Sequence, residues 1–183
     1  MRIPGIPGRG VSAGALTLLA ILIYLLVSGG DGGDSPSGDD RPNPAGVAAS
    51  GSVQARVLRV VDGDTVDVSI DGDTEDVRYI GIDTPETVKP GEPVQCYGPE
   101  ASDFNHRLVE GETVRLVFDH ELRDVYGRLL AYVYVGDRFV NAALVRGGYA
   151  RTLEIPPNTT RADRLAGLEQ RAGRDGIGLW GAC

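Results

Sequence analysis

Acidic residues and arginines gather in four short parts of the chain. They are residues 62–65 (DGDT), Arg78, residues 83–86 (DTPE) and residues 124–128 (DVYGR). Hard cations such as calcium bind carboxylate and carbonyl oxygens, and the planar arginine side chain can bind two oxygens of one phosphate. Cleavage of a phosphodiester needs both functions together with an activated water. The set therefore indicates metal-assisted chemistry on a phosphate ester.

The residue types suggest a role for each position. Asp64, Asp83 and the carbonyl oxygen of Thr84 can bind a cation. Glu86 follows directly and can accept a proton from an attacking water. Taken singly, each residue also has a purely structural explanation, such as a salt bridge between Asp64 and Arg78 or the formation of a turn. The complete set favours the catalytic interpretation.

Residue parity predicts where these side chains point. Asp64 is in step with Val66, and Arg78 is in step with Ile80, so both charged residues are expected on rows that face a core. Charged side chains on such rows are costly unless they lie at a rim and have partners. We therefore expect Asp64, Arg78 and Asp83 to meet at the mouth of a barrel.

The elements that must position these residues are short strands joined by tight turns, with helices between them. Expected strands lie at 57–61, 66–70, 77–82, 114–118 and 129–135, and expected helices at 99–110, 140–145 and 160–172. Thr159 or Thr160 is expected to cap the last helix. The pattern predicts an α+β fold that is mainly β, a closed five-stranded barrel with three helices.

The charge of the chain limits how it can bind nucleic acid. The formal net charge of the 183 residues is -8. A broad basic face that holds nucleic acid through its phosphates is therefore excluded. Any such binding must depend on a local site, with a cation.

The N-terminal part predicts export. Arginines precede an apolar run at 13–27, so residues 1–29 are expected to be a signal peptide or a membrane anchor, and both alternatives stay open. Residues 30–52 are rich in Gly, Ser, Asp and Pro and predict a flexible linker. The folded domain is expected at 53–183, outside the cytoplasm, at the cell surface or secreted.

Cysteine usage agrees with that location. The two cysteines, Cys96 and Cys183, are too few for a four-ligand zinc site. In an exported protein they predict one disulfide bond that links the loop before a helix to the C-terminus.

From about Val57 to Trp180 the chain resembles the staphylococcal nuclease (thermonuclease) family. The resemblance rests on the segments VVDGDTVDV, RYIGIDTPE, YGPEAS, DVYGRLLAYVYV, VNAALVRGGYA and PPNTT. It implies an OB-like five-stranded barrel with three helices. It also implies calcium-dependent hydrolysis of DNA and RNA by a monomeric domain.

The resemblance also assigns roles by position. The calcium ligands would be Asp64, Asp83 and the carbonyl of Thr84, with Asp62 as a nearby carboxylate outside that set. Glu86 would be the general base or the group that orients water. The phosphate-binding groups would be Arg78, Arg128 and, for a terminal phosphate, Tyr126.

Two departures from the family pattern predict weaker binding of substrate. Val125 stands where the family often has a lysine, and residues 152–157 lack the tyrosines that often stack on a base there. We therefore expect a stronger dependence on the cation. The alternative function is a noncatalytic OB-like module of the cell envelope that binds nucleic acid or another ligand.

Overall fold

The computed structural model describes residues 48–49, 51–87, 91 and 93–183, all within the compact unit Ser37–Cys183. The expected signal peptide or anchor and most of the expected linker lie outside these residues. Within the described part of the chain, none of the helices combines the length and the apolar character needed to cross a membrane.

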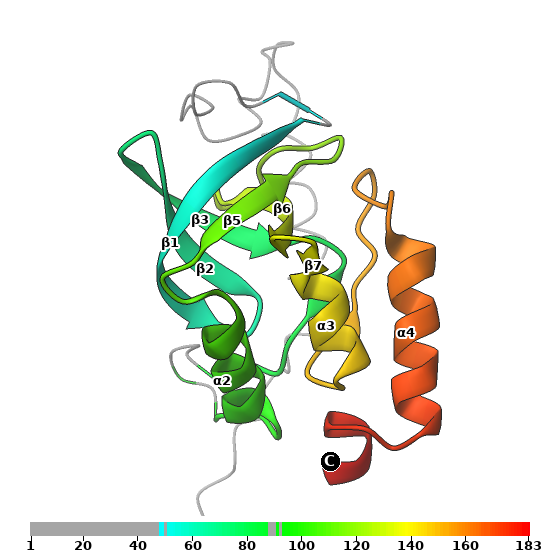
Figure 1. Cartoon of the computed structure of the whole chain (residues 1–183). Coiled ribbons are helices and arrows are strands. Elements are labelled where there is room, and N and C mark those ends of the chain that lie inside the picture. Colours follow the sequence, from blue (N-terminus) through cyan, green and yellow to red (C-terminus); the bar gives the residue numbers. More distant parts are fainter. Residues whose placement is uncertain (1–47, 50, 88–90, 92) are drawn as a thin grey trace, which may run out of the picture. The chain divides into compact units, whose positions relative to one another are not determined.

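Five strands close into a barrel (Figure 1). They are β1 (Ser52–Asp62), β2 (Thr65–Ile70), β3 (Asp73–Tyr79), β5 (Thr113–Val117) and β6 (Leu129–Val135). Antiparallel pairs run in the order β3-β2-β1-β5-β6, and a parallel pairing between β3 and β6 closes the ring. The short strand β7 (Arg138–Phe139) extends the sheet beside β6. The OB-like barrel expected from the sequence is thereby confirmed.

Alternating burial explains why β2 forms the wall of this barrel. Val66, Val68 and Ile70 are buried, whereas Asp67 and Ser69 between them are partly exposed. Side chains two residues apart point to the same face of a strand, so the apolar row packs inside the barrel. Burying one such side chain contributes about 1.5–3 kcal/mol.

The third strand differs from the expected one, and the prediction that Arg78 lies on the core-facing row is wrong, although Arg78 does meet Asp64 and Asp83. The inward row of β3 is Val77 and Tyr79, so the partly exposed Arg78 lies on the other face. The strand stops because Gly81 has a φ of +79°, which residues with a Cβ rarely adopt. The alternation changes phase just before this glycine, because Tyr79 and Ile80 are adjacent and both buried, and Ile82 is buried in step with Ile80.

After this break, the chain forms a second, smaller sheet. Strand β4 (Ile82–Asp83) pairs with β8 (Arg151–Thr152), and Asp83 lies opposite Arg151. This pairing places residues 82–83 close to the C-terminal third of the domain.

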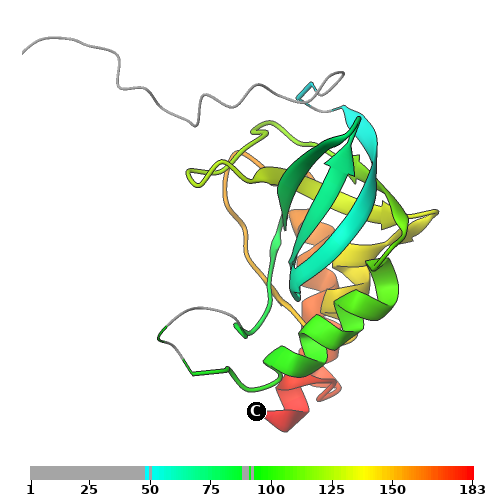
Figure 2. The same ribbon diagram turned by 90° about the vertical axis from the view of Figure 1, so that its left-hand side faces the viewer.

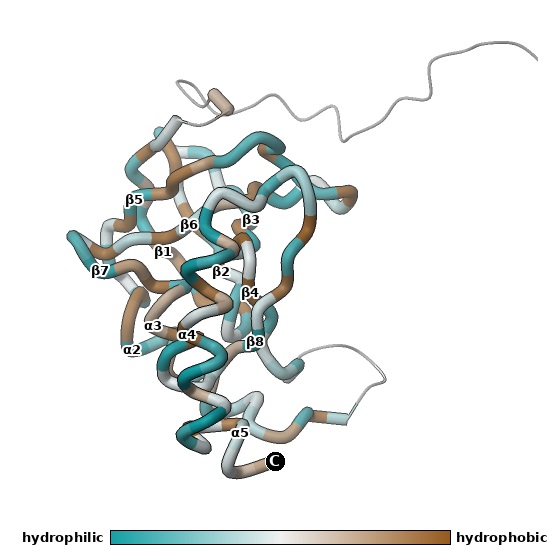
Figure 3. Tube along the Cα trace, turned by 90° about the vertical axis from the view of Figure 1, so that its right-hand side faces the viewer, coloured by the Kyte–Doolittle hydropathy of each residue, from teal (hydrophilic) through white to brown (hydrophobic). Residues whose placement is uncertain are grey.

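Three helices pack on the barrel and on one another: α2 (Gly98–Val109), α3 (Val140–Arg146) and α4 (Ala162–Arg174). Figure 2 shows α2 at one end of the barrel, with the C-terminal end near its start. Helix α3 lies between α4 and the barrel (Figure 1). Helix α4 is largely hydrophilic (Figure 3) and buries only Leu165 and Ala172. A four-residue helix, α5 (Leu179–Ala182), ends the chain.

The start of α4 also differs from the expectation. Its N-cap is Arg161, and no side chain caps the helix. Thr160 instead donates through its hydroxyl and its amide to Asp119, at 2.8 and 3.0 Å, and the Tyr132 hydroxyl donates to the same carboxylate at 3.1 Å. Asp119 therefore connects the segment before α4 to the barrel.

These hydrogen bonds change the acidity of Asp119. Burial by itself raises its pKa, but the bonds from Thr160 and Tyr132 outweigh burial, and the pKa lies below its ordinary value of 3.8. A carboxyl group whose pKa is lower in the folded than in the unfolded protein stabilises the fold above the unfolded pKa. That stability is lost as the pH falls through the folded pKa.

We predict that Asp119→Asn lowers the free energy of unfolding at pH 7 by about 1–3 kcal/mol, because the three donors lose a charged acceptor. The difference from the wild type should shrink as the pH falls below about 4. Thermal unfolding of both proteins between pH 7 and pH 3 measures it. A difference that stays constant over this range would contradict the role of the ionised carboxylate.

Candidate active site

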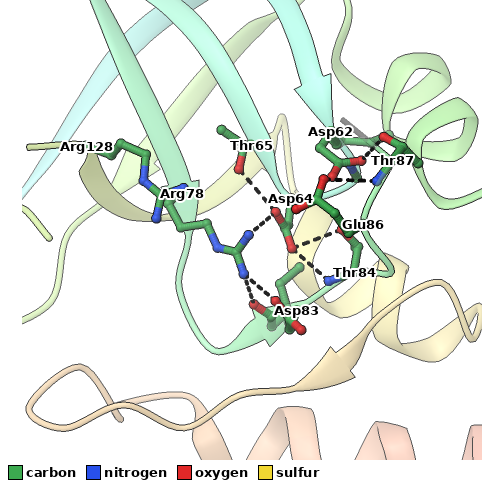
Figure 4. A network of polar contacts seen from close by, with 12 residues as sticks. Asp62, Asp64, Thr65, Arg78, Asp83, Thr84, Glu86, Thr87 and Arg128 are labelled. Atoms are coloured by element: carbon green, nitrogen blue, oxygen red, sulfur yellow. Dashed lines mark hydrogen bonds and ion pairs between the residues drawn. The ribbon is translucent and has the colours of Figure 1, made fainter. Parts of the chain in front are cut away.

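Asp64 is the centre of a polar network at the turn between β1 and β2 (Figure 4). Only 1% of the residue is exposed. One carboxylate oxygen accepts hydrogen bonds from the Arg78 guanidinium and from the Thr65 hydroxyl. The other accepts from the amide and the hydroxyl of Thr84, at 2.7 and 3.0 Å. One buried carboxylate thus joins three segments of the chain.

Arg78 connects the two aspartates that the sequence assigns to the cation. Its guanidinium contacts Asp64 through Nη1, and its Nη2 lies 2.7 Å from Oδ1 of Asp83. Figure 4 shows the guanidinium directed toward both carboxylates. The side chain of Asp83 is 55% exposed, so its contact with Arg78 is open to water and to ligands.

Asp62 and Glu86 form a second group of carboxyls beside Asp64. Burial, together with the nearby Glu86 and Asp64, raises the pKa of Asp62 to about 6, although hydrogen bonds from Thr87 and Gly63 act in the opposite direction. Burial also raises the pKa of Asp64, although Arg78 and Thr84 act in the opposite direction. Neighbouring acids with raised pKa values mark a place where a cation would be favoured.

Glu86 is held through its backbone. Its amide donates to Oε1 of Gln95 at 3.1 Å, and the Gln95 amide donates back to the Glu86 carbonyl at 2.9 Å. Its carboxylate accepts from the Thr87 amide at 3.0 Å, and the Thr87 hydroxyl donates to Asp62 at 2.7 Å. Sequence reasoning missed Gln95 and Thr87. Thr87 adjoins the DTPE segment, whereas no pattern pointed to Gln95.

The turn that precedes β6 carries the second arginine. Oδ1 of Asp124 accepts from the amides of Tyr126 and Arg128, both at 3.0 Å. Oδ2 of Asp124 accepts from Nε of Arg128 at 2.7 Å and lies 2.6 Å from its Nη2. The Arg128 guanidinium also lies 5.4 Å from the centre of the Tyr126 ring. Asp124 therefore shapes the turn and orients Arg128 at the same time.

A buried ion pair fixes this turn to β3. Arg123 donates to both carboxylate oxygens of Glu75, at 2.9 and 2.8 Å, and to the carbonyl of Gly127 at 2.7 Å. Each side chain of the pair is only 10% exposed. Glu75 belongs to the strand that carries Arg78, so the pair relates the two arginine-bearing segments. Neither residue was predicted from the sequence, because they are 48 positions apart.

A pocket of about 410 Å³ adjoins Arg78 and Arg128. Its lining includes four exposed apolar side chains, those of Val125, Tyr126, Leu153 and Ile155. The three aliphatic ones occupy the positions where the sequence departs from the expected lysine and tyrosines. The lining of the pocket thus combines two arginines with exposed apolar side chains.

The structure brings most of the expected site residues together. The carboxylate network contains Asp62, Asp64, Arg78, Asp83, Thr84 and Glu86. Arg128 and Tyr126 line the adjoining pocket with Arg78. Over the described residues, no three or more His, Cys, Asp or Glu side chains are grouped so that they could hold a metal ion. The expected calcium ligands include only two carboxylates.

Cys96 and Cys183 are joined by a disulfide bond, with their Cα atoms 6.1 Å apart. The bond connects the segment just before α2 with the last residue of the chain. It closes a sequence separation of 87 residues.

Comparison with known proteins places the chain in a family. Residues 76–182 match the family model described as Staphylococcal nuclease homologue. The chain is 39% identical over 172 residues to a protein named thermonuclease from Staphylococcus intermedius, covering 94% of this chain and 98% of the relative. It is 42% identical over 136 residues to a thermonuclease from Staphylococcus hyicus, with 74% and 80% covered.

The match to a third relative covers a smaller share of that relative's length. It is a Bacillus subtilis protein named endonuclease YncB, 44% identical over 130 residues, which are 70% of this chain and 62% of that one. The chain belongs to the staphylococcal nuclease family. It is a nuclease, a hydrolase whose substrate is nucleic acid, and not the noncatalytic module considered as the alternative.

We predict that Glu75→Met destabilises the domain by about 3–5 kcal/mol, because it leaves the buried Arg123 without its acid partner. The double variant Glu75→Met/Arg123→Met should recover most of this loss, since an apolar pair avoids the cost of burying charge. Urea unfolding of the wild type, both single variants and the double variant forms a complete cycle. A double variant that is no more stable than the single ones would refute the coupling.

Proposed function

We propose that this nuclease is calcium-dependent, cleaves DNA and RNA, and acts outside the cytoplasm as a monomeric domain. The observation that carries the proposal is the buried Asp64, which Arg78 and Thr84 hold next to two further acids. Such a group of carboxyls is costly to ionise without a cation.

The residues present fit a hard cation. Asp64 and Asp83 offer carboxylates and Thr84 a backbone carbonyl, all of them oxygen ligands of the kind calcium takes. Asp62 lies beside these ligands and adds negative charge, but it is not proposed to bind the cation directly. A bound calcium ion would supply positive charge to offset the charge that develops on the phosphate oxygens.

The remaining roles are assigned to side chains around these ligands. Glu86 either accepts a proton from the attacking water or orients that water. Arg78 and Arg128 bind phosphate oxygens and stabilise the charge of the transition state. Tyr126, which is 75% exposed, contacts a terminal phosphate. Both arginines are paired with aspartates in the structure, so phosphate binding exchanges one anionic partner for another.

Substrate contacts beyond the phosphate fall on the apolar residues that line the pocket. Leu153 and Ile155 can pack against a base but lack the flat ring that aromatic stacking needs. Val125 is 88% exposed and carries no charge that could attract a further phosphate. The affinity for nucleic acid would then come mostly from the cation and the two arginines.

The proposed location rests on residues 1–29 as a signal peptide or anchor, which would direct the domain to the cell surface or the medium. An uncleaved segment would also attach the domain to the membrane. The Cys96–Cys183 disulfide suits the oxidising conditions found there.

We predict that the purified chain cleaves single-stranded DNA when calcium is present and stops when EGTA is added. Glu86→Gln should lower kcat by about 10²- to 10⁴-fold while the domain stays folded, because the proton acceptor is lost. The matched control is Glu100→Gln, which removes an exposed carboxylate in the first turn of α2. Activity that survives EGTA would exclude calcium dependence, and unchanged turnover in Glu86→Gln would exclude the role of Glu86.

We also predict that Ile155→Tyr lowers the KM for single-stranded oligonucleotides, because stacking of a base on an aromatic ring contributes about 1–3 kcal/mol. Ile177→Tyr, at another exposed isoleucine outside the pocket, is the control and should leave KM unchanged. Equal KM values for Ile155→Tyr and the wild type would argue against base binding at this position.

A further inference from the structure

We propose that Gln95 is a positioning residue for Glu86 and that the Cys96–Cys183 disulfide keeps Gln95 in place. Turnover would then depend on the oxidation state of the two cysteines. The inference rests on the proposed role of Glu86 in activating water.

The contacts of Gln95 are reciprocal. Its side-chain oxygen accepts from the Glu86 amide, and its own amide donates to the Glu86 carbonyl. A side chain and a backbone that both bond to one residue fix the direction of the chain at that residue. Glu86 and Gln95 lie nine positions apart, so these bonds hold together the two ends of the segment between them.

The start of α2 packs closely against the backbone of Glu86 and the side chain of Thr87. The amide of Gly98 donates to the Gln95 carbonyl at 3.0 Å. A Cβ atom placed on Gly98 would lie 2.8 Å from Cγ2 of Thr87 and 3.1 Å from the Glu86 carbonyl oxygen. Because only glycine permits this approach, the Glu86 segment packs directly on the backbone at the start of the helix.

Cys96 follows Gln95 and is bonded to the C-terminal tail. That tail is itself well anchored. The Leu179 amide donates to the Gly148 carbonyl at 2.9 Å, and the guanidinium of Arg151 lies 4.2 Å from the centre of the Trp180 ring. A Cβ on Gly148 would collide with the Ile177 carbonyl oxygen at 2.1 Å. The disulfide therefore fixes Gln95 to a part of the domain that packs closely on the end of α3.

Both cysteines are exposed, so the bond is accessible to external thiols. Reduction consumes two thiol groups. One thiolate attacks a protein sulfur and releases the other cysteine, and a second attacks the external sulfur of the mixed disulfide and releases the first cysteine, so the products are two cysteine thiols and one external disulfide. The reverse exchange with an oxidised disulfide, such as oxidised glutathione, restores the bond. Reduction removes the covalent connection next to Gln95 but none of the groups proposed to contact substrate.

The first test replaces Gln95 and leaves the disulfide intact. Gln95→Leu removes the acceptor of the Glu86 amide and should lower kcat by about ten- to a hundred-fold with little change in KM, as expected when a reacting group is misplaced. Gln95→Glu keeps an acceptor oxygen and should restore part of the loss. Gln170→Leu, an exposed glutamine on α4, is the matched control. Equal kcat values for Gln95→Leu and the wild type would overturn the proposal.

The second test compares oxidised wild type, wild type reduced with dithiothreitol, and Cys96→Ser/Cys183→Ser, all with saturating calcium. The two forms without the disulfide should share a lower kcat at similar KM, while Cys96→Ser/Cys183→Ser should not respond to dithiothreitol. Circular dichroism at the assay temperature verifies that each form is folded, since removing a disulfide that closes a long loop destabilises the folded state.

The outcomes separate this inference from the proposed function. Oxidised wild type that fails to cleave DNA with calcium would refute the proposed function itself. Oxidised and reduced enzymes that are both folded and equally active would refute only the role of the disulfide. If the reduced form unfolds, the kcat of Gln95→Leu still tests whether Gln95 positions Glu86, because that variant keeps the disulfide.

Discussion

Asp64 is a carboxylate withdrawn from water, and its need for partners determines the arrangement around it. Arg78 comes from the end of β3 and Thr84 from the residues after β4, so one acid draws both segments to the turn between β1 and β2. An ionised acid in such a place is tolerated only when charge and hydrogen bonds compensate its lost hydration. The same compensation leaves Asp83 beside Arg78 at the surface, where water and ligands have access.

The acidic character of the protein and its action on nucleic acid are compatible because the positive charge is used locally. The chain has a net charge of -8, yet the two arginines of the site are each held by an aspartate. Pairing prevents the arginines from spreading over many conformations and directs their planar groups before a phosphate arrives. The long-range field of the protein would then oppose approach of the substrate, while the site itself favours its binding.

Much of the fold followed from alternation and turn signals, and the site from short motifs. Val66, Val68 and Ile70 are buried as expected, and the family was evident from segments such as RYIGIDTPE. The face of Arg78 was misjudged, because β3 ends at Tyr79 and the buried Ile80 and Ile82 follow in the opposite phase, so their parity does not apply to the strand. Thr160 bonds to Asp119 instead of capping a helix. Partners such as Glu75 and Arg123 meet only in the folded barrel, so no local pattern could reveal them.

The parallel pairing that closes the barrel also sets the distance between Arg78 and Arg128, the two arginines proposed to bind phosphate. Val77 lies opposite Leu129 and Arg78 opposite Leu130, so Arg128 comes immediately before the first paired residue of β6. A slip of one residue in this register would displace Arg128 by about 3.3 Å along the strand and turn alternate side chains to the opposite face. The spacing of the two proposed catalytic arginines is thus a property of strand register, and a register shift in β6 would change it even if every side chain of the site were retained.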